Sequence, residues 1–399
     1  MSEIIRWQMT QALGGVRIVD LTQVMAGPFC TMLLADLGAD VIKIEPPGGD
    51  LTRSMGGRRL QMKGDDNAPF LALNRNKRSV VLDLKQPEDQ DRLLTLLRHA
   101  DVLVESFRPG VAERLGVGYE RVQALNERLV YASISGFGQT GPWADRPGFD
   151  LIAQAMSGVM SVTGSDEAEP VKSGIPVSDL AAGLYAANGI QAALLARQHT
   201  GRGQRVETSL FEAALGLSVW EATEYWATGD APRPLGSAHR LSAPYQAFRA
   251  RDGFLTIAAL TTSHWERLCN VIDRPGLASD AKYATNADRL ANLETLVREL
   301  ERALAAHTVA EWVDLLLAEG VPCGPILDYA QVFAAPHTSD RGMVEVVDHP
   351  VEGPVRTLGV PVKLSDTPGS VRQPPPRLGE HTGAVLASLE AGRSPWVVA

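Results

Sequence analysis

Short apolar runs alternate with segments of helical periodicity over the first 135 residues of the chain. The runs are rich in β-branched residues and are predicted to be buried strands, at 15–22, 40–45, 79–84, 101–107 and 129–135. The intervening segments are predicted to be helices, at 28–39, 88–100 and 111–129. This alternation predicts an α/β fold with a parallel sheet covered by helices on both faces, and ligands at the carboxyl ends of its strands.

The pattern changes in the second half of the chain. Segment 228–244 contains three prolines and has no periodicity, and a new unit begins with an apolar run at 253–260. Near the end, three consecutive prolines from Pro374 predict an extended crossing segment. We therefore expect a large Rossmann-like domain and a smaller α/β domain, divided as 1–204 (first part of the large domain), 205–228 (a linking helix), 229–325 (the small domain) and 326–399 (the return to the large domain).

Charge and cysteine content limit the binding partners and the cellular compartment that we expect. The net charge of −9 argues against a surface that binds nucleic acid broadly, although a local basic pocket remains compatible with it. The three widely spaced cysteines suit a reducing compartment better than a disulfide framework. The N-terminal residues lack the apolar run of a signal peptide, and the longest uncharged run, 180–196, is short for a membrane span. We expect a soluble cytoplasmic protein.

Several common chemistries lack their motifs. No His pair or Cys pair has the spacing of a metal site, so no metal is expected. There is no G-x-S-x-G nucleophile elbow. The loop after the first strand is "TQVMAGPF" (22–29), which lacks the glycine fingerprint of a dinucleotide-binding loop. This absence disfavours a Rossmann oxidoreductase.

Asp179 is a lone carboxylate at the start of an Ala- and Gly-rich helix that carries no other charge until Arg197. One interpretation is an N-cap, a position at which Asp is favoured. The other is a nucleophile, held ionised by the helix terminus and approached over small neighbours such as Gly174 and Gly183. The local sequence leaves both open.

Two basic loops are candidates for phosphate binding. The first, "LNRNKRS" (73–79), precedes a predicted strand, and the second, "SFRPGVAERLG" (106–116), follows one. We expect both loops at the same edge of the sheet. The alternative for each basic residue is a solvated surface patch.

Eight stretches between about residues 15 and 385 resemble the class III CoA-transferases, the family of formyl-CoA transferase, carnitine CoA-transferase and α-methylacyl-CoA racemase. They are "GVRIVDLTQVMAGPF", "LGADVIKIEPPGGDLTR", "LNRNKRSVVLDLK", "VESFRPGVAERLG", "ASISGFGQTGP", "SGIPVSDLAAGLYA", "HTGRGQRVETSLFEAAL" and "PPPRLGEHT". The resemblance implies a Rossmann-like domain plus a smaller domain in an interlocked homodimer. It also implies acyl-CoA and a small carboxylic acid as substrates, with no tightly bound cofactor.

The resemblance also assigns roles to residues. It aligns Asp179 with the family's nucleophile, which attacks an acyl-CoA to give an acyl-aspartyl anhydride and then an aspartyl-CoA thioester. Besides acting as the nucleophile, Asp179 is expected to cap its helix. By motif, the resemblance assigns CoA contacts to Met25, Ala26, Asn74, Arg75, Asn76, Lys77, Ser106, Phe107, Arg108, Arg114, Ser135, Gly136 and Phe137.

Departures from the family pattern bear on the substrate. Formyl-CoA transferase has Gln where Met25 stands, Arg where Pro46 stands, and a glycine-rich loop where this chain has "GSAHRLSAPY" (236–245). These differences disfavour formate and oxalate. The loop resembles succinyl-CoA:dicarboxylate transferases, including glutarate and hydroxymethylglutarate enzymes, with His239 and Arg240 as candidate ligands of a second carboxylate; the alternative is a surface loop.

Two further activities stay as alternatives. The racemases of the family place a His before the Asp of a G-x-D motif, and here that position is Phe149, which cannot carry a proton. A CoA-binding protein without catalysis would tolerate the loss of Asp179. The expectation is therefore a class III CoA-transferase that moves CoA from an acyl-CoA, with succinyl-CoA favoured, to a dicarboxylic acid.

Overall fold

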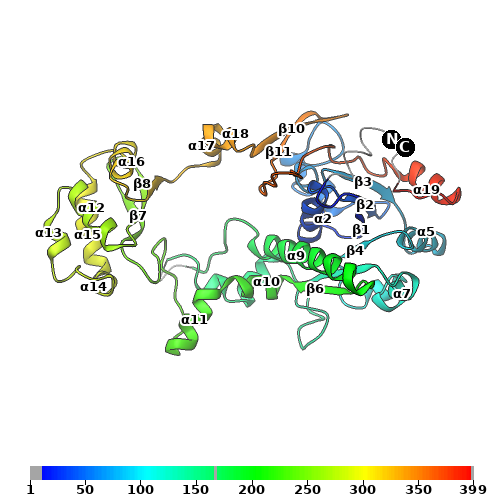
Figure 1. Cartoon of the computed structure of the whole chain (residues 1–399), viewed down its shortest axis with the longest axis horizontal. Helices are drawn as coiled ribbons and strands as arrows, with labels where there is room; N and C mark the ends of the chain where they lie inside the picture. The colour runs from blue at the N-terminus through cyan, green and yellow to red at the C-terminus, as the bar shows by residue number, and fades with distance from the viewer. Residues whose placement is uncertain (1–10, 166–168, 397–399) are drawn as a thin grey trace. The chain divides into compact units, whose positions relative to one another are not determined.

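A six-stranded parallel sheet forms the centre of the first structural unit (Figure 1). The computed structural model describes residues 11–165 and 169–396; the first ten residues, which carry most of the segment searched for a signal peptide, lie outside it. The strand order is β3-β2-β1-β4-β5-β6. The strands are β1 (Arg17–Asp20), β2 (Asp40–Glu45), β3 (Lys77–Val81), β4 (Val102–Glu105), β5 (Val130–Ser135) and β6 (Arg205–Ser209).

Helices cover both faces of this sheet because successive strand residues point to opposite sides (Figure 1). One face, which includes Ile18, packs against α2 (Ala26–Asp36), α8 (Asp150–Met156), α9 (Val177–Thr200) and α10 (Leu210–Leu217). The other face, which includes Val19, packs against α5 (Pro87–Leu97), α6 (Val111–Arg114), α7 (Tyr119–Leu125) and α19 (Thr382–Glu390). The predicted parallel α/β architecture is confirmed.

Two predicted helices are wrong in part. Residues 205–209 of the expected linking helix form β6, which pairs with β5; their alternation of side-chain exposure suits an edge strand. A separate helix, α11 (Val219–Thr228), follows α10. The expected helix at 111–129 is divided into α6 and α7, because Gly116 between them has φ +74°, a left-handed conformation.

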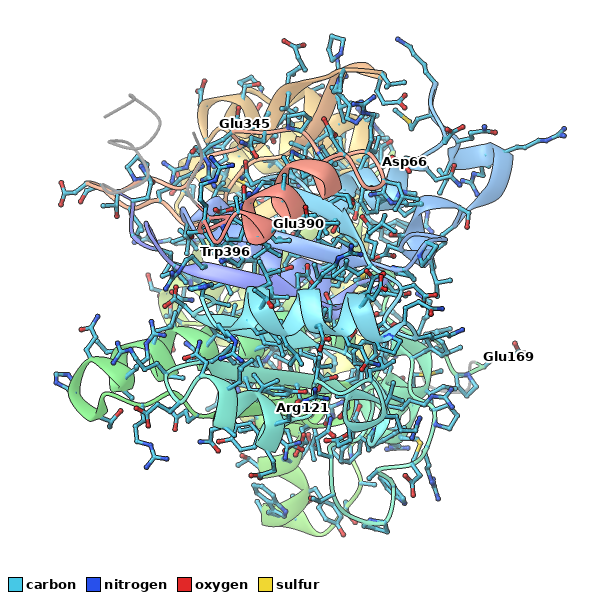
Figure 2. All side chains as sticks on the ribbon, turned by 90° about the vertical axis from the view of Figure 1, so that its right-hand side faces the viewer. Asp66, Arg121, Glu169, Glu345, Glu390 and Trp396 are labelled. Atoms are coloured by element: carbon cyan, nitrogen blue, oxygen red, sulfur yellow. The ribbon has the colours of Figure 1, made fainter. Side chains whose placement is uncertain are left out.

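The C-terminal segment covers the β3 edge of the sheet. The Asn76 N–H donates to the Gln373 carbonyl, and the Gly379 N–H donates to Ser79 Oγ. Farther on, Arg78 lies 5.7 Å from the ring of Trp396, which Figure 2 labels beyond the end of α19. The predicted extended segment therefore follows an edge strand and occupies backbone groups that would otherwise be open to another chain.

The second unit contains residues 160–171 and 229–335, so it continues past residue 325 and includes a separate earlier segment. An antiparallel sheet, β7 (Tyr245–Arg249), β8 (Phe254–Ala258) and β9 (Cys323–Pro325), packs with helices around buried Trp265 and Leu300. Its helices are α12 (Thr262–Val271), α13 (Gly276–Ser279), α14 (Asn286–Ala291), α15 (Leu293–Leu304), α16 (Val309–Ala318) and α17 (Tyr329–Ala334).

The remaining elements are short. They belong to the first unit, except that one 3-10 helix begins in the first unit and ends in the second. They are η1 (Leu51–Arg53), α3 (Gly57–Leu60), α4 (Ala68–Leu73), η2 (Val159–Ser161), α18 (Pro336–Asp340) and the hairpin β10 (Val344–His349) with β11 (Gly353–Leu358). Within residues 11–165 and 169–396, no helix has the length and apolarity needed to cross a membrane.

Candidate active site

Asp179 lies in the first turn of α9, which begins at Val177. Pro176 occupies the N-cap position and makes no side-chain capping bond. The expectation that Asp179 caps its helix is therefore wrong, because the helix has already begun two residues earlier. Its half-buried carboxylate is left for another role.

A second carboxylate stands beside this helix start. Asp150, the first residue of α8, accepts a hydrogen bond from the Ser178 N–H at 2.9 Å through Oδ1. Its Oδ2 accepts from buried Gln154 Nε2 at 2.7 Å, and Gln154 Oε1 accepts from the Ser173 N–H. These bonds fix the start of α9 against α8 and bring two acidic side chains together.

The environment favours the protonated form of Asp179. Burial and the negative charge of Asp150 raise its pKa from the ordinary value of 3.8 to about 7. The sequence argument had the helix terminus holding this group ionised. The structure opposes that expectation, because desolvation and a like charge both disfavour the anion. Near neutral pH the carboxyl therefore titrates, and its anion is a stronger base than an ordinary aspartate.

The loop at residues 22–26 lies against the same face of α9. Gly183, one helical turn after Asp179, approaches so closely that a Cβ there would lie 2.7 Å from the Ala26 carbonyl oxygen. Met25 occupies the N-cap position of α2 without a side-chain capping bond. The missing side chain of Gly183 thus lets α9 approach the Ala26 backbone closely. The contact roles expected for Met25 and Ala26 stay predictions.

Gly136 provides a second close approach, after β5. A Cβ at Gly136 would lie 2.8 Å from the Gly148 Cα, so the two glycines bring the segment that carries Phe149 and Asp150 against the end of β5. Ser135 Oγ accepts from the Gly138 N–H, and buried Phe137 packs among aromatic rings. The structure therefore gives this expected contact motif a role in placing Asp150.

A pocket of about 170 Å³ opens at the carboxyl ends of β1 to β4. This is the edge at which parallel α/β sheets bind ligands. The pocket walls are largely apolar, with Asp83 and Lys85 among the polar groups. The lining residues are Leu21, Gln23, Ile44, Glu45, Pro46, Leu82, Asp83, Leu84, Lys85, Phe107 and Leu115.

Among the CoA contacts expected from the sequence, Phe107 alone lines this pocket, and Pro46, which the sequence marked as a departure from the family pattern, lines it too. The sequence analysis placed 82–84 inside a strand, whereas β3 ends at Val81 and the next four residues form the loop at its carboxyl end. The apolar run at 79–84 did not show where the strand stopped. Ser106 lies next to this pocket and its Oγ accepts from the Gln23 N–H at 3.3 Å, while Arg108 and Arg114 are exposed on the same loop and helix.

The other expected contact motif, Asn74 to Lys77, lies at the opposite edge. Lys77 begins β3, so the two basic loops do not share an edge of the sheet, and that expectation is wrong. All four side chains are buried and engaged by the protein: Lys77 Nζ contacts Asp20 Oδ2 at 3.2 Å, and Arg75 pairs with Asp36 at 2.7 Å. Their observed contacts anchor α2 and the C-terminal segment.

His239 and Arg240 belong to the second unit. The His239 ring stacks on Tyr245 with 4.7 Å between the ring centroids, and its Nδ1 accepts from the Leu241 N–H. Arg240 donates to the Arg233 carbonyl. The loop is thus internally ordered and presents a half-buried imidazole and guanidinium.

No cluster of three potential metal ligands is found in the part of the chain that the structure describes. Cys30, Cys269 and Cys323 are free thiols. Phe149, at the position where racemases carry His, is 66% exposed and directly precedes Asp150. Phe149 is thus the sequence neighbour of Asp150, and it cannot exchange a proton.

Residues 13–382 match CoA-transferase family III. The chain is 42% identical over 390 residues to the succinyl-CoA:mesaconate CoA-transferase of Haloarcula hispanica, covering 96% of this chain and 97% of that protein. It is also 42% identical over 380 residues to the acetyl-CoA:oxalate CoA-transferase of Acetobacter aceti, covering 94% and 95%. A solved CAIB/BAIF family protein from Brucella suis is similar with a TM-score of 0.85 and 37% identity, covering 95% of this chain and all of that one. The matched range covers the second unit, most of the first unit and the whole of α9.

Proposed function

Because this chain belongs to CoA-transferase family III and is a class III CoA-transferase, we propose that it transfers CoA to a dicarboxylic acid through covalent intermediates on Asp179. The observation that carries the proposal is the half-buried Asp179 carboxyl, with a pKa of about 7, on the face of α9 that packs against Ala26. Succinyl-CoA is the donor that we favour.

The proposed sequence has four covalent steps. A carboxylate oxygen of Asp179 attacks the thioester carbonyl of the donor; the C–S bond breaks, giving an acyl-aspartyl anhydride and CoA thiolate. The thiolate attacks the aspartyl carbonyl and expels the donor acid as a carboxylate. The acceptor carboxylate then attacks the aspartyl thioester, and the released thiolate attacks the acceptor carbonyl. The last step forms the new acyl-CoA and restores the Asp179 carboxylate.

The raised pKa of Asp179 suits these exchanges. A carboxylate whose conjugate acid has a pKa near 7 is more basic than one near 4, so it is a better nucleophile toward a thioester. Burial also excludes water, which would hydrolyse the anhydride. Asp150 contributes to both properties by its charge and by its bond to the Ser178 N–H.

We place the nucleotide end of CoA at the pocket near the carboxyl ends of β1 to β4. Its apolar walls, including Leu82 and Phe107, suit the faces of a purine, and its position follows the rule for parallel sheets. The exposed guanidinium groups of Arg108 and Arg114 suit the phosphates. Met25 and Ala26 would face the thioester end.

The identity of the acceptor acid is also proposed. One 42% identical relative is named for mesaconate and the other for oxalate, so identity alone does not select the acid. We favour a longer dicarboxylate because residues 236–245 carry His239 and Arg240 instead of a glycine-rich loop. Two cationic or hydrogen-bonding side chains suit a second carboxylate.

We also propose a homodimer. Helix α11 exposes Trp220 (56% exposed) and Trp226 (77% exposed), and neighbouring Leu217 is also exposed. Exposed large aromatic side chains are enriched at interfaces between protein chains. Light scattering after gel filtration should give a mass of two chains; a mass of one chain at micromolar concentration would refute this part.

Trapping of the intermediate tests the central proposal. The protein is mixed with succinyl-CoA or another acyl-CoA, treated with neutral hydroxylamine and digested. The peptide that contains Asp179 should carry a hydroxamate, and the Asp179→Asn protein should not. Transfer activity without modification at this position, with every donor that turns over, would rule out the acyl-aspartyl mechanism.

A further inference from the structure

The loop that faces the Asp179 helix contains a backbone outlier. Val24 has φ +69°, in the left-handed region. Such values are unusual for any residue with a side chain and more so for a β-branched one, because Cβ then crowds the backbone. Strain of this kind persists only where surrounding contacts hold it, and it is concentrated at functional sites.

A buried ion pair holds this backbone conformation of Val24. The Val24 N–H donates to Asp50 Oδ1 at 3.3 Å, and Asp50 Oδ2 forms an ion pair with Lys43 Nζ at 2.8 Å. Lys43 Nζ in turn donates to the Thr22 carbonyl at 2.7 Å. Both partners of the ion pair have fully buried side chains. One ion pair therefore binds the loop on either side of Gln23.

The two charges are retained in the interior. Burial disfavours the charged form of both side chains. Lys43 nevertheless lowers the pKa of Asp50, and Asp20 and Asp50 raise the pKa of Lys43. A buried ion pair is seldom the most stabilising choice, because desolvation offsets much of the attraction. A requirement for one particular loop geometry explains why such a pair stands here.

The loop has little freedom to shift relative to α2. A Cβ at Gly27 would lie 2.2 Å from Thr22 Cβ, so the chain turns tightly from the strand end into the helix. The Thr22 hydroxyl and N–H both donate to buried Asp20 Oδ1. If Val24 left its left-handed conformation, Met25 and Ala26 would therefore be displaced, because these side chains do not hold them.

We propose that Asp50, paired with Lys43, is a positioning residue for the transfer reaction, because it holds Val24 in its left-handed conformation and thereby sets Met25 and Ala26 against the Asp179 helix. This inference rests on the proposed function of Asp179. Asp50 itself does not touch the reacting atoms; it acts through the loop. A displacement of about 1 Å at such a loop can cost as much as about 100-fold in rate.

The test compares kcat with the dissociation constant for free CoA. Asp50→Asn should lower kcat by about 10- to 100-fold and change the dissociation constant for free CoA much less, because most residues that line the nucleotide pocket, such as Leu82 and Phe107, lie outside this loop. The matched control is Asp36→Asn, which breaks the buried pair with Arg75 at the opposite edge. The control should lose stability and keep its kcat.

Glycine supplies a rescue that a purely structural role would not show. In the double variant Asp50→Asn with Val24→Gly, the residue at 24 adopts positive φ without strain, so part of the lost kcat should return. The single variant Val24→Pro fixes φ near −65° without unpairing a buried charge, and it should lower kcat even if Asp50→Asn does not fold. Unchanged kcat in Val24→Pro, or equal losses in Asp50→Asn and Asp36→Asn, or no rescue by glycine in a folded double variant, would overturn the positioning role.

Hydroxylamine trapping on the unaltered protein separates this inference from the proposed function. Modification at Asp179 together with full activity of a folded Asp50→Asn protein would reject only the positioning role. Absence of modification during turnover would reject the covalent role of Asp179, on which the inference rests.

Discussion

Two groups of buried carboxylates in the same unit have opposite electrostatic environments. At the base of the loop 22–26, Asp20 is fully buried, but Lys77 and Lys43 outweigh that burial and lower its pKa to about 2. At the start of α9, burial and the charge of Asp150 act in the same direction and raise the pKa of Asp179 to about 7. The first carboxylate is fixed as an anion, whereas the second changes its charge near neutral pH.

The difference separates structure from chemistry. An anion held by ammonium groups is a poor nucleophile, because attack on a substrate would break the ion pairs that stabilise it. Asp179 has no ion pair within residues 11–165 and 169–396, so its lone pairs are available once the proton leaves. The environment of Asp179 therefore suits covalent catalysis, and that of Asp20 does not.

The largest expected effect is the loss of transfer in Asp179→Asn. Under the proposed mechanism, kcat should fall by at least about a thousandfold, since the covalent intermediate cannot form without the Asp179 carboxylate. The circular dichroism spectrum should be unchanged. Asp150→Asn is the matched control, because it changes the neighbouring carboxylate in the same way and should keep most of the activity. Comparable losses in both variants would erase the distinction drawn between the two residues.

Lys77→Met tests the paired region and should act on stability. It removes one of the two cations that face Asp20, and leaving a buried charge short of its partner costs about 3–5 kcal/mol in the free energy of unfolding. Urea unfolding measures this loss. CoA affinity per folded molecule should stay within about twofold. A large loss of affinity without a loss of stability would return Lys77 to the role of a CoA contact.

The pH dependence of activity should follow Asp179. The anion is the reactive form, so kcat/KM of the free enzyme should rise with pH and level off above a pKa of about 7. At pH 6 it should be about tenfold below the plateau, because about one molecule in ten is then ionised. An activity that stays level down to pH 5 would contradict the assigned environment.

The stability of the fold should change in the opposite direction. The folded-state pKa of Asp179 lies above the ordinary 3.8, so its protonated form stabilises the fold fully below pH 3.8, and this contribution is lost as the pH rises toward about 7. Asp179→Asn removes the cost of the buried anion. The variant should therefore unfold at higher urea concentration than the original protein at pH 8, with no difference at pH 3.5. An equal midpoint for both proteins at pH 8 would count against the raised pKa.

The sequence predicted the sheet well because its strands are continuous apolar runs; the prediction for β2 coincides with the strand at 40–45. It could not show the end of β3, since Leu82 continues the apolar run although it lines the pocket. Nor could it show that Lys77 is buried, because basic residues near a strand look alike whether they face solvent or an internal Asp20. Asp179 was found from the family resemblance, but its raised pKa depends on Asp150, which is 29 positions earlier in the chain.

The smallest effect is expected for Asp150→Asn, which is also the most direct test of the comparison between the two environments. The amide removes the like charge but keeps an oxygen that can accept from the Ser178 N–H, so α9 should keep its place against α8. The pKa of Asp179 should fall, while burial, the larger cause, keeps it above 3.8. The acidic limb of kcat/KM should therefore move to lower pH with a plateau reduced by no more than about threefold. Asp150→Glu, which keeps the charge on a side chain one methylene longer, should leave the limb near its original position. A limb that does not move in Asp150→Asn would mean that burial alone sets the proton affinity of the nucleophile, and the pairing of the two carboxylates would then serve only to orient the helix start.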